Sequence, residues 1–109
     1  MTSIVLITGA SGGIGRALAN QLHSQGLRVA VVGRDMDRLT DVDAALRIAA
    51  DTTTPEGAQQ AIATCQESLG AAPSLLAHCV GSTLIAPLHR TSVQAYREVM
   101  RINLDSAVF

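Results

Sequence analysis

The sequence predicts an α/β fold: a doubly wound parallel sheet of about four strands in the order 3-2-1-4, with helices on both faces. Short apolar segments alternate with helical segments along the chain, and right-handed crossovers between them give this strand order. A glycine-rich turn joins the first apolar segment directly to the first helix. The core must be aliphatic, because the 109 residues include no Trp, one Tyr and one Phe, and this suits a buried parallel sheet.

The first half of the chain predicts three strands and two helices. Strands are expected at residues 3–7, 28–32 and 46–50, which are short and rich in aliphatic side chains. A helix is expected from about Ile14, where apolar residues recur at helical spacing, and Gly26 ends it. A second, short helix is expected around residues 37–45.

The second half predicts one strand between two helices. A helix starts with Pro55 in its first turn and is terminated by Gly70, and a strand follows at residues 74–80. Thr91 and Gln94 have the spacing of a capping box, which predicts the start of the last helix. That helix carries one apolar face from Val93 to Val108.

The predicted strand order places a ligand crevice between the first and fourth strands, where the winding direction reverses. The glycine-rich turn and the end of the fourth strand meet at this point. The chain still has a helical pattern at Phe109, and a full doubly wound fold has about six strands. The sequence therefore predicts one domain over residues 1–109 that is truncated at its C-terminus.

Charge and composition exclude several classes of function. The formal net charge is −1 and the arginines are scattered, so neither nucleic acid nor an anionic membrane is an expected partner. There is no apolar run of membrane-spanning length and no secretory leader, which predicts a cytoplasmic protein. Cys65 and Cys79 lie far apart without metal-ligand spacing, so reduced, packed thiols are expected and no metal site is predicted.

The glycine-rich turn has the pattern Thr-Gly-x-x-x-Gly-x-Gly, with Gly9, Gly13 and Gly15 as its fixed glycines. A Gly-x-Gly-x-x-Gly motif does not fit this spacing, and a P-loop is excluded because the chain contains no lysine. A strand, a tight turn and a helix N-terminus in this order present unpaired N–H groups to an anion. We interpret the turn as a phosphate-binding site.

Residues 8–17, Thr-Gly-Ala-Ser-Gly-Gly-Ile-Gly-Arg-Ala, closely resemble the cofactor fingerprint of the short-chain dehydrogenases/reductases. This family comprises NAD(P)-dependent oxidoreductases on a Rossmann-type fold. The resemblance runs the length of the chain, which covers only the N-terminal part of such an enzyme. It implies that the turn contacts the cofactor pyrophosphate through Thr8, Gly9, Ser11, Gly13, Ile14 and Gly15.

Two further positions bear on the cofactor. Arg34 follows the second strand, where an arginine suits the 2′-phosphate of NADP and an acidic residue would favour NAD. NADP is therefore preferred over NAD, although Asp35 would occupy this place after a shift of one residue, and a solvated surface arginine is the alternative. Asp51 matches the family aspartate that binds the adenine amino group; an ordinary Asx turn is the alternative.

The segment from His78 to Gly81 stands where the family has Asn-Asn-Ala-Gly, and only the glycine is kept. Gly81 permits close approach of the backbone to the cofactor. His78 is interpreted as a hydrogen-bonded residue at the strand end rather than a proton carrier. Asn103 lies beside the apolar stripe of the last helix and resembles the family's active-site asparagine, which implies a catalytic role; a locally satisfied helix asparagine is the alternative.

The resemblance implies hydride transfer between the nicotinamide and a small carbonyl or alcohol substrate, with Tyr and Lys as acid/base machinery. The only tyrosine, Tyr96, is followed four positions on by Met100 instead of lysine. The 109 residues alone are therefore predicted to be inactive. A complete enzyme could form a homo-oligomer. The alternative function is a non-catalytic nucleotide-binding or interaction protein. An extended sugar-nucleotide epimerase is disfavoured because its glycine spacing differs.

Overall fold

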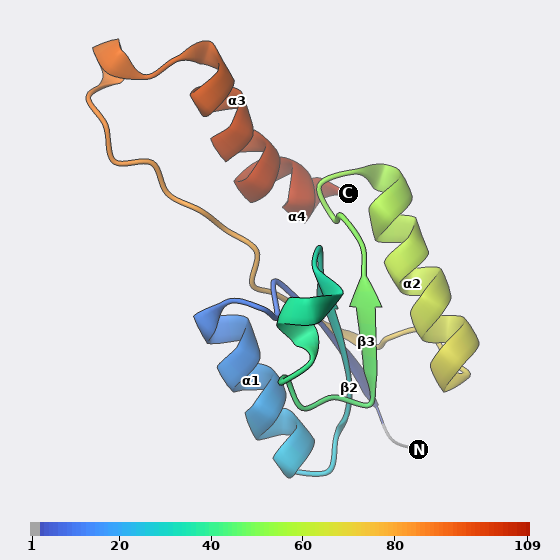
Figure 1. Cartoon of the computed structure of the whole chain (residues 1–109). Helices are drawn as coiled ribbons and strands as arrows, with labels where there is room; N and C mark the ends of the chain where they lie inside the picture. Colours follow the sequence, from blue (N-terminus) through green and yellow to red (C-terminus); the bar gives the residue numbers. More distant parts are fainter. Residues whose placement is uncertain (1–2) are drawn as a thin grey trace.

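The computed structural model describes residues 3–109 and contains a four-stranded parallel sheet in the order β3-β2-β1-β4, as predicted (Figure 1). Its strands are β1 (Ile4–Thr8), β2 (Arg28–Gly33), β3 (Leu46–Ala49) and β4 (Leu75–His78). The helices are α1 (Gly13–Ser24), α2 (Pro55–Leu69), α3 (Val93–Met100) and α4 (Ser106–Val108). Short 3₁₀ helices cover Met36–Leu39 and Leu88–Arg90, and a π-helical turn covers Arg101–Asp105.

The central strands β1 and β2 are buried on both faces of the sheet, to which their side chains point alternately. On one face Ile4 and Leu6 pack with Ala61 and Cys65 of α2. On the other face Val5, Ile7, Val29 and Val31 pack against the α1 side of the molecule, with Ala19 of α1 fully buried. This two-sided burial explains why the strands read as unbroken aliphatic runs.

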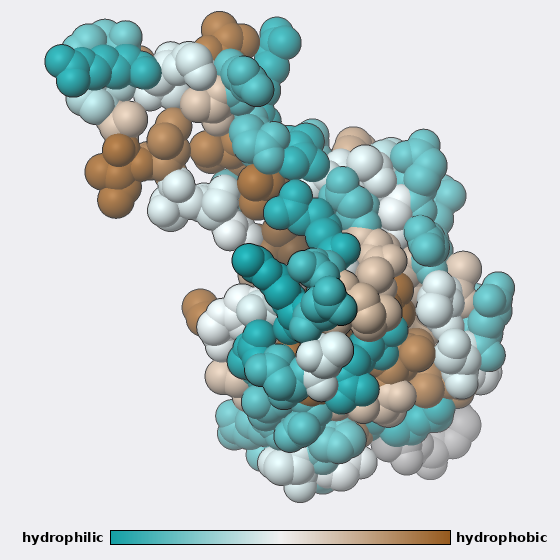
Figure 2. All heavy atoms as spheres, viewed as in Figure 1, coloured by the Kyte–Doolittle hydropathy of each residue, from teal (hydrophilic) through white to brown (hydrophobic). Residues whose placement is uncertain are grey.

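The β4 side of the sheet is less covered. Leu75 and Leu76 of β4 are 56% and 66% exposed, whereas Val29 and Val31 of β2 are fully buried. An apolar hollow lies between β4 and α2, lined in part by Ile62, Leu76 and Phe109. Apolar side chains are also exposed along the extended segment that leads to α3, at the upper left of Figure 2. Within residues 3–109, no helix has the length and apolar character needed to cross a membrane.

The helix predicted around residues 37–45 is wrong. Only Met36–Leu39 is helical, as a 3₁₀ turn that Asp35 caps by accepting a hydrogen bond from the Asp37 N–H. Further along, side chains from other elements satisfy the backbone. The Arg47 side chain donates to the carbonyl oxygens of Leu39 and Val42. Because these groups already have partners, a regular helix is not needed to bury them.

The capping box predicted for Thr91 and Gln94 is also wrong. Ser92 is the N-cap of α3, and its hydroxyl oxygen accepts a hydrogen bond from the Ala95 N–H at 3.0 Å. The last helix is not one regular α-helix either, because the π turn at Arg101–Asp105 interrupts it. A π turn adds a residue to the helical repeat, so the side chains after it face directions that a single apolar stripe does not predict.

We expect the Ile7→Ala variant to lose about 3 kcal/mol of unfolding free energy, because a buried aliphatic side chain at the sheet centre leaves a cavity when truncated. Leu75→Ala is the matched control on the neighbouring β4, where the side chain is already more than half exposed. We expect it to lose less than about 1 kcal/mol. Urea denaturation followed by circular dichroism measures both, and equal losses would contradict this account of the core.

Candidate functional site

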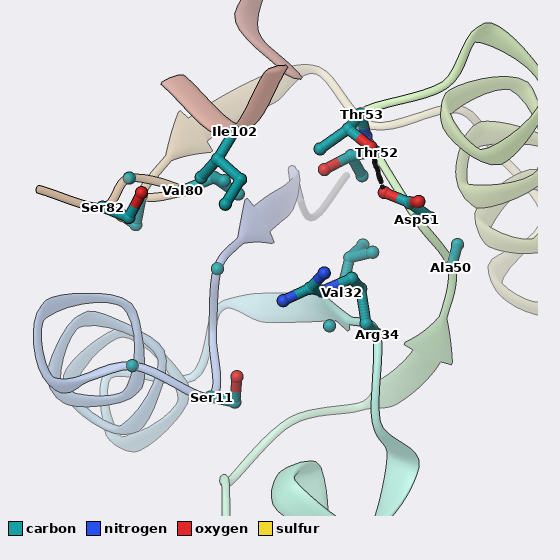
Figure 3. Close-up of a pocket in the computed structure, with 15 residues that line it drawn as sticks. Ser11, Val32, Arg34, Ala50, Asp51, Thr52, Thr53, Val80, Ser82 and Ile102 are labelled. Atoms are coloured by element: carbon teal, nitrogen blue, oxygen red, sulfur yellow. Dashed lines mark hydrogen bonds between the residues drawn. The ribbon is translucent and has the colours of Figure 1, made fainter. Parts of the chain in front are cut away.

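A cavity of about 230 Å³ lies at the carboxyl ends of the parallel strands (Figure 3). Its walls come from the glycine-rich turn, the ends of β2 and β3, the loop after β4 and the π turn. The lining residues are Gly9, Ser11, Gly12, Val32, Gly33, Arg34, Ala50, Asp51, Thr52, Thr53, Cys79, Val80, Gly81, Ser82 and Ile102. The cavity is at the predicted switch point, where β1 lies between β2 and β4.

The glycine-rich turn is shaped by two close contacts between backbone segments. Gly9 has φ of +64°, and a Cβ at this position would lie 2.5 Å from the carbonyl oxygen of Cys79. A Cβ on Gly15 would collide with the carbonyl oxygen of Gly9. These two glycines therefore let α1 and the loop after β4 pack directly against the end of β1.

The N-terminus of α1 differs from those of the two other long helices. Thr54 caps α2 and Ser92 caps α3 through their side-chain oxygens, whereas the N-cap of α1 is Gly12, which has no side chain to accept a hydrogen bond. The N–H groups of the first turn of α1 lack intrahelical partners, since every α-helix begins in this way. Gly13 has no atom near the position of an added Cβ, so packing within the chain does not require a glycine there.

The predicted site residues fall into two groups around the cavity. Those that line it are Gly9, Ser11, Arg34, Asp51 and Gly81, and those that lie beside it without lining it are Thr8, Gly13, Ile14, Gly15 and Asn103. Ile14 is 80% exposed on the first turn of α1, so it has no role in the core. Five lining residues from four segments, each at the end of one of the four strands, are thus brought together from positions up to 72 apart in the sequence.

Arg34 and Asp35 occupy different environments. The Arg34 side chain extends from the end of β2 into the cavity, as Figure 3 shows, and it forms no ion pair among residues 3–109. The Asp35 carboxylate instead accepts the Asp37 N–H at 3.0 Å. The structure therefore places the cation, and not the neighbouring carboxylate, at the cavity wall.

Asp51 takes part in an Asx turn and also lines the cavity. Its Oδ1 accepts hydrogen bonds from the Thr53 N–H at 3.0 Å and from the Thr53 hydroxyl. These bonds, first of all the one from the hydroxyl, hold the pKa of Asp51 below its usual value, with smaller contributions from Arg101 and Arg34. Asp51 Oδ2 lies 3.7 Å from Arg101 Nη1. The Asx-turn interpretation of Asp51 is therefore confirmed for Oδ1, and the adenine interpretation stays a prediction.

Asn103 binds the loop that follows β4. Its Oδ1 accepts the Ser82 N–H at 3.1 Å, and its Nδ2 donates to the Ser82 and Val99 carbonyl oxygens at 2.9 Å. A Cβ on Gly81 would lie 3.1 Å from Asn103 Oδ1, which explains a small residue at position 81. The amide is thus satisfied both by its own helix and by the loop, and it fixes the π turn next to the cavity.

His78 is hydrogen-bonded on both sides, as predicted. Its Nδ1 lies 2.8 Å from the Thr8 hydroxyl, and its Nε2 lies 3.2 Å from the Ser106 hydroxyl. These contacts join β1, β4 and α4. No cluster of three or more His, Cys, Asp or Glu side chains suited to a metal ion occurs in the part of the chain that the structure describes.

The sequence interpretation missed several lining residues, among them Thr53, Ser82 and Ile102. Thr53 had a signal, because a threonine two positions after Asp51 can close an Asx turn. Ser82 and Ile102 had none, because their place at the cavity depends on the π turn and on the loop held by Asn103.

Strand order, a glycine turn that opens α1 and a cavity at the switch point define a doubly wound domain of the Rossmann type. The chain belongs to the short-chain dehydrogenase family, whose model matches residues 3–109. A relative in this family is 2-(R)-hydroxypropyl-CoM dehydrogenase of Xanthobacter autotrophicus, 30% identical over 115 residues, which cover 95% of this chain and 46% of that protein. The chain spans about half the length of the curated relatives it matches.

Solved structures agree with this fold. A short-chain dehydrogenase/reductase (glucose/ribitol dehydrogenase) from Brucella melitensis is 26% identical, with a TM-score of 0.88 over 97% of this chain and 46% of that one. A 3-ketoacyl-(acyl-carrier-protein) reductase from the same organism, crystallised with NADH, is 22% identical, with a TM-score of 0.87 over 97% of this chain and 46% of that one. Both structures therefore support, for the described residues, the fold of the family whose model matches the chain.

We expect Gly15→Ala to cost roughly 2 kcal/mol of stability, because its methyl group would collide with backbone of the preceding turn. Gly13→Ala is the matched control in the same helical turn, where the methyl group meets only open space. It should leave stability unchanged or raise it by about 0.5 kcal/mol. Thermal denaturation measures both, and a loss for Gly13→Ala as large as that for Gly15→Ala would contradict the contact described.

Proposed function

We propose that the cavity binds a nicotinamide dinucleotide and prefers NADP over NAD. The observation that carries the preference is Arg34, whose guanidinium points into the cavity at the end of β2 and forms no ion pair among residues 3–109. Arginine binds phosphate through charge-assisted hydrogen bonds, and the end of the second strand is where this fold meets the adenosine ribose. Asp35, which would favour NAD at that place, is engaged as a cap.

The remaining cofactor contacts follow if the adenosine ribose lies at the end of β2. The glycine turn, with Thr8, Gly9 and Ser11, and the uncapped first turn of α1, with Gly13, Ile14 and Gly15, would hold the pyrophosphate. At the adenine end, Asp51 Oδ2 would accept from the amino group, because Oδ1 is bonded to Thr53 while Oδ2 has only the longer contact with Arg101 among residues 3–109. Gly81 would let the loop after β4 approach the dinucleotide closely.

We propose carbonyl–alcohol interconversion as the reaction of the complete enzyme, with a small-molecule substrate. The bound nicotinamide would supply hydride chemistry. Within this chain, Asn103 would hold the loop at Ser82 and the π turn in fixed positions beside the cavity. The predicted cytoplasmic location, homo-oligomerisation and truncation of the domain stay predictions.

A non-catalytic nucleotide-binding protein is the second candidate. It is favoured by one observation: the chain contains no lysine, and Tyr96 is 54% exposed on α3, so no tyrosine–lysine pair faces the cavity. Both candidates bind dinucleotide, and they differ in whether sequence beyond these residues supplies acid/base groups. Cooperative unfolding of the 109-residue protein, together with NADPH binding, would favour the second candidate.

We expect Arg34→Ala to weaken NADPH binding roughly 10- to 100-fold, because it removes charge-assisted hydrogen bonds worth about 1.5–3 kcal/mol. NADH binding should change less than about threefold, since NADH has no 2′-phosphate. Fluorescence titration of both cofactors measures this. Asp35→Ala is the control for the neighbouring position and should not raise NADH affinity. Equal losses for the two cofactors would refute the preference for NADP.

We expect the 109-residue protein to show no dehydrogenase activity with aldehydes, ketones or alcohols. The lysine that lowers the pKa of a catalytic tyrosine in this family is absent, so proton transfer to the substrate has no tuned donor. The absorbance of NADPH at 340 nm reports any turnover. Any turnover would contradict the prediction, and turnover that survives Tyr96→Phe would show that its proton donor is not a tyrosine.

A further inference from the structure

Arg101 links the helical segment beside the cavity to the predicted adenine end. It is the first residue of the π turn, next to Ile102, which lines the cavity. Its Nη1 donates to the Thr53 hydroxyl oxygen and lies 3.7 Å from Asp51 Oδ2. Arg101 is only 32% exposed, although it is a charged side chain near the chain surface.

Glu98 fixes the orientation of the Arg101 guanidinium through the nitrogens that do not contact Thr53. Nε and Nη2 donate to the two carboxylate oxygens of Glu98 at 3.0 and 2.6 Å, a bidentate pair on the same helical segment. A bidentate pair constrains the plane of the guanidinium as well as its position. Nη1 is therefore directed at Thr53 while the other nitrogens are occupied by Glu98.

Thr53 passes this constraint on to Asp51. Its hydroxyl accepts a hydrogen bond from Arg101 and donates its own hydrogen to Asp51 Oδ1, so donor and acceptor capacities are both used. Asp51 Oδ1 also accepts the Thr53 N–H. Among residues 3–109 the hydrogen bonds of this carboxylate all go to Oδ1, so Oδ2 keeps only the 3.7 Å contact with Arg101, and Asp51 lines the cavity.

We propose that Arg101 is a positioning residue for the adenine end of the dinucleotide site, acting through Thr53 and Asp51. It holds the Asp51 carboxylate so that Oδ2 is available to accept from an adenine amino group. It also ties that carboxylate to the segment that carries Ile102 and Asn103, so adenine binding and the placement of this segment are coupled. The inference rests on the proposed dinucleotide function.

Arg101 and Arg34 then have separable roles. Arg34 lines the cavity, forms no ion pair in the described part of the chain and would contact the 2′-phosphate, whereas Arg101 does not line the cavity and acts on the carboxylate. Loss of Arg34 should affect only ligands with a 2′-phosphate. Loss of Arg101 should affect every ligand with an adenine, with or without that phosphate.

The test compares Arg101→Met with Arg97→Met in equilibrium titrations of two adenine probes, 5′-AMP and adenosine 2′,5′-bisphosphate. Arg97 is the matched control, an arginine about one helical turn earlier that forms no ion pair in the described part of the chain. We expect Arg101→Met to bind both probes about tenfold more weakly, which corresponds to about 1.4 kcal/mol. Arg97→Met should match the unmodified protein.

The pH dependence separates positioning from a general loss of structure. Arg101 contributes to keeping the pKa of Asp51 low, so without it Asp51 becomes protonated at a higher pH. The ratio of the AMP dissociation constants of the two variants should therefore grow as the pH falls from about 6 towards 4, near the usual range of aspartate. The ligand's own titration is common to both variants and cancels in this ratio.

Each outcome decides something. AMP affinity within twofold of the Arg97→Met control, or a ratio that does not change with pH, overturns the role of Arg101 and leaves the proposed function standing. Failure of the unmodified protein to bind either probe overturns both. If Arg101→Met does not fold, Glu98→Ala gives the answer, because it frees the guanidinium plane at an exposed position. It should weaken AMP binding roughly threefold, and an unchanged affinity would refute the inference.

Discussion

The close approach of Gly9 to its neighbours is the constraint on which the rest of the site depends. The loop after β4 packs so near to Gly9 that no side chain fits there, and Gly15 of α1 packs against the Gly9 carbonyl. The Ala10 N–H, next in sequence, donates to the Val32 carbonyl oxygen of β2 at 3.3 Å. One turn of backbone thus joins two strands, a helix and a loop, and the cavity is the space left around it.

Much of the fold was predictable because its signals are local. Each signal needs only a few neighbouring residues to be recognised: aliphatic runs indicate strands, Pro55 a helix start, and Gly26 and Gly70 helix ends. The strand order then follows from short right-handed crossovers. The errors occur where distant side chains decide the backbone. Arg47 replaces a helix after Leu39, and no local propensity reports a partner that lies further along the chain.

The site was predictable to a similar depth. The position of Arg34 at the cavity wall follows from the strand that precedes it, but the choice between Arg34 and Asp35 required the 3₁₀ turn that engages Asp35. The link from Arg101 to Thr53 had no sequence signal, because it joins residues 48 positions apart through a π turn. A regular α-helix over the same residues would direct these side chains differently.

The hydrogen bonds of His78 connect the strands at the glycine turn with the last helical segment of the chain. The Ser106 hydroxyl donates to the Ile102 carbonyl oxygen, so towards His78 it can only accept, and Nε2 must carry the hydrogen. Nδ1 is then the acceptor of the Thr8 hydroxyl hydrogen, while Thr8 Oγ1 accepts the Cys79 N–H.

The hydrogen bonds thus run in one direction, from the Cys79 N–H through the side chains of Thr8, His78 and Ser106 to the Ile102 carbonyl oxygen, and each hydrogen has one acceptor. These hydrogen bonds join the glycine turn to the helical segment that carries Asn103. The His78 side chain therefore ties together the elements on both sides of the cavity.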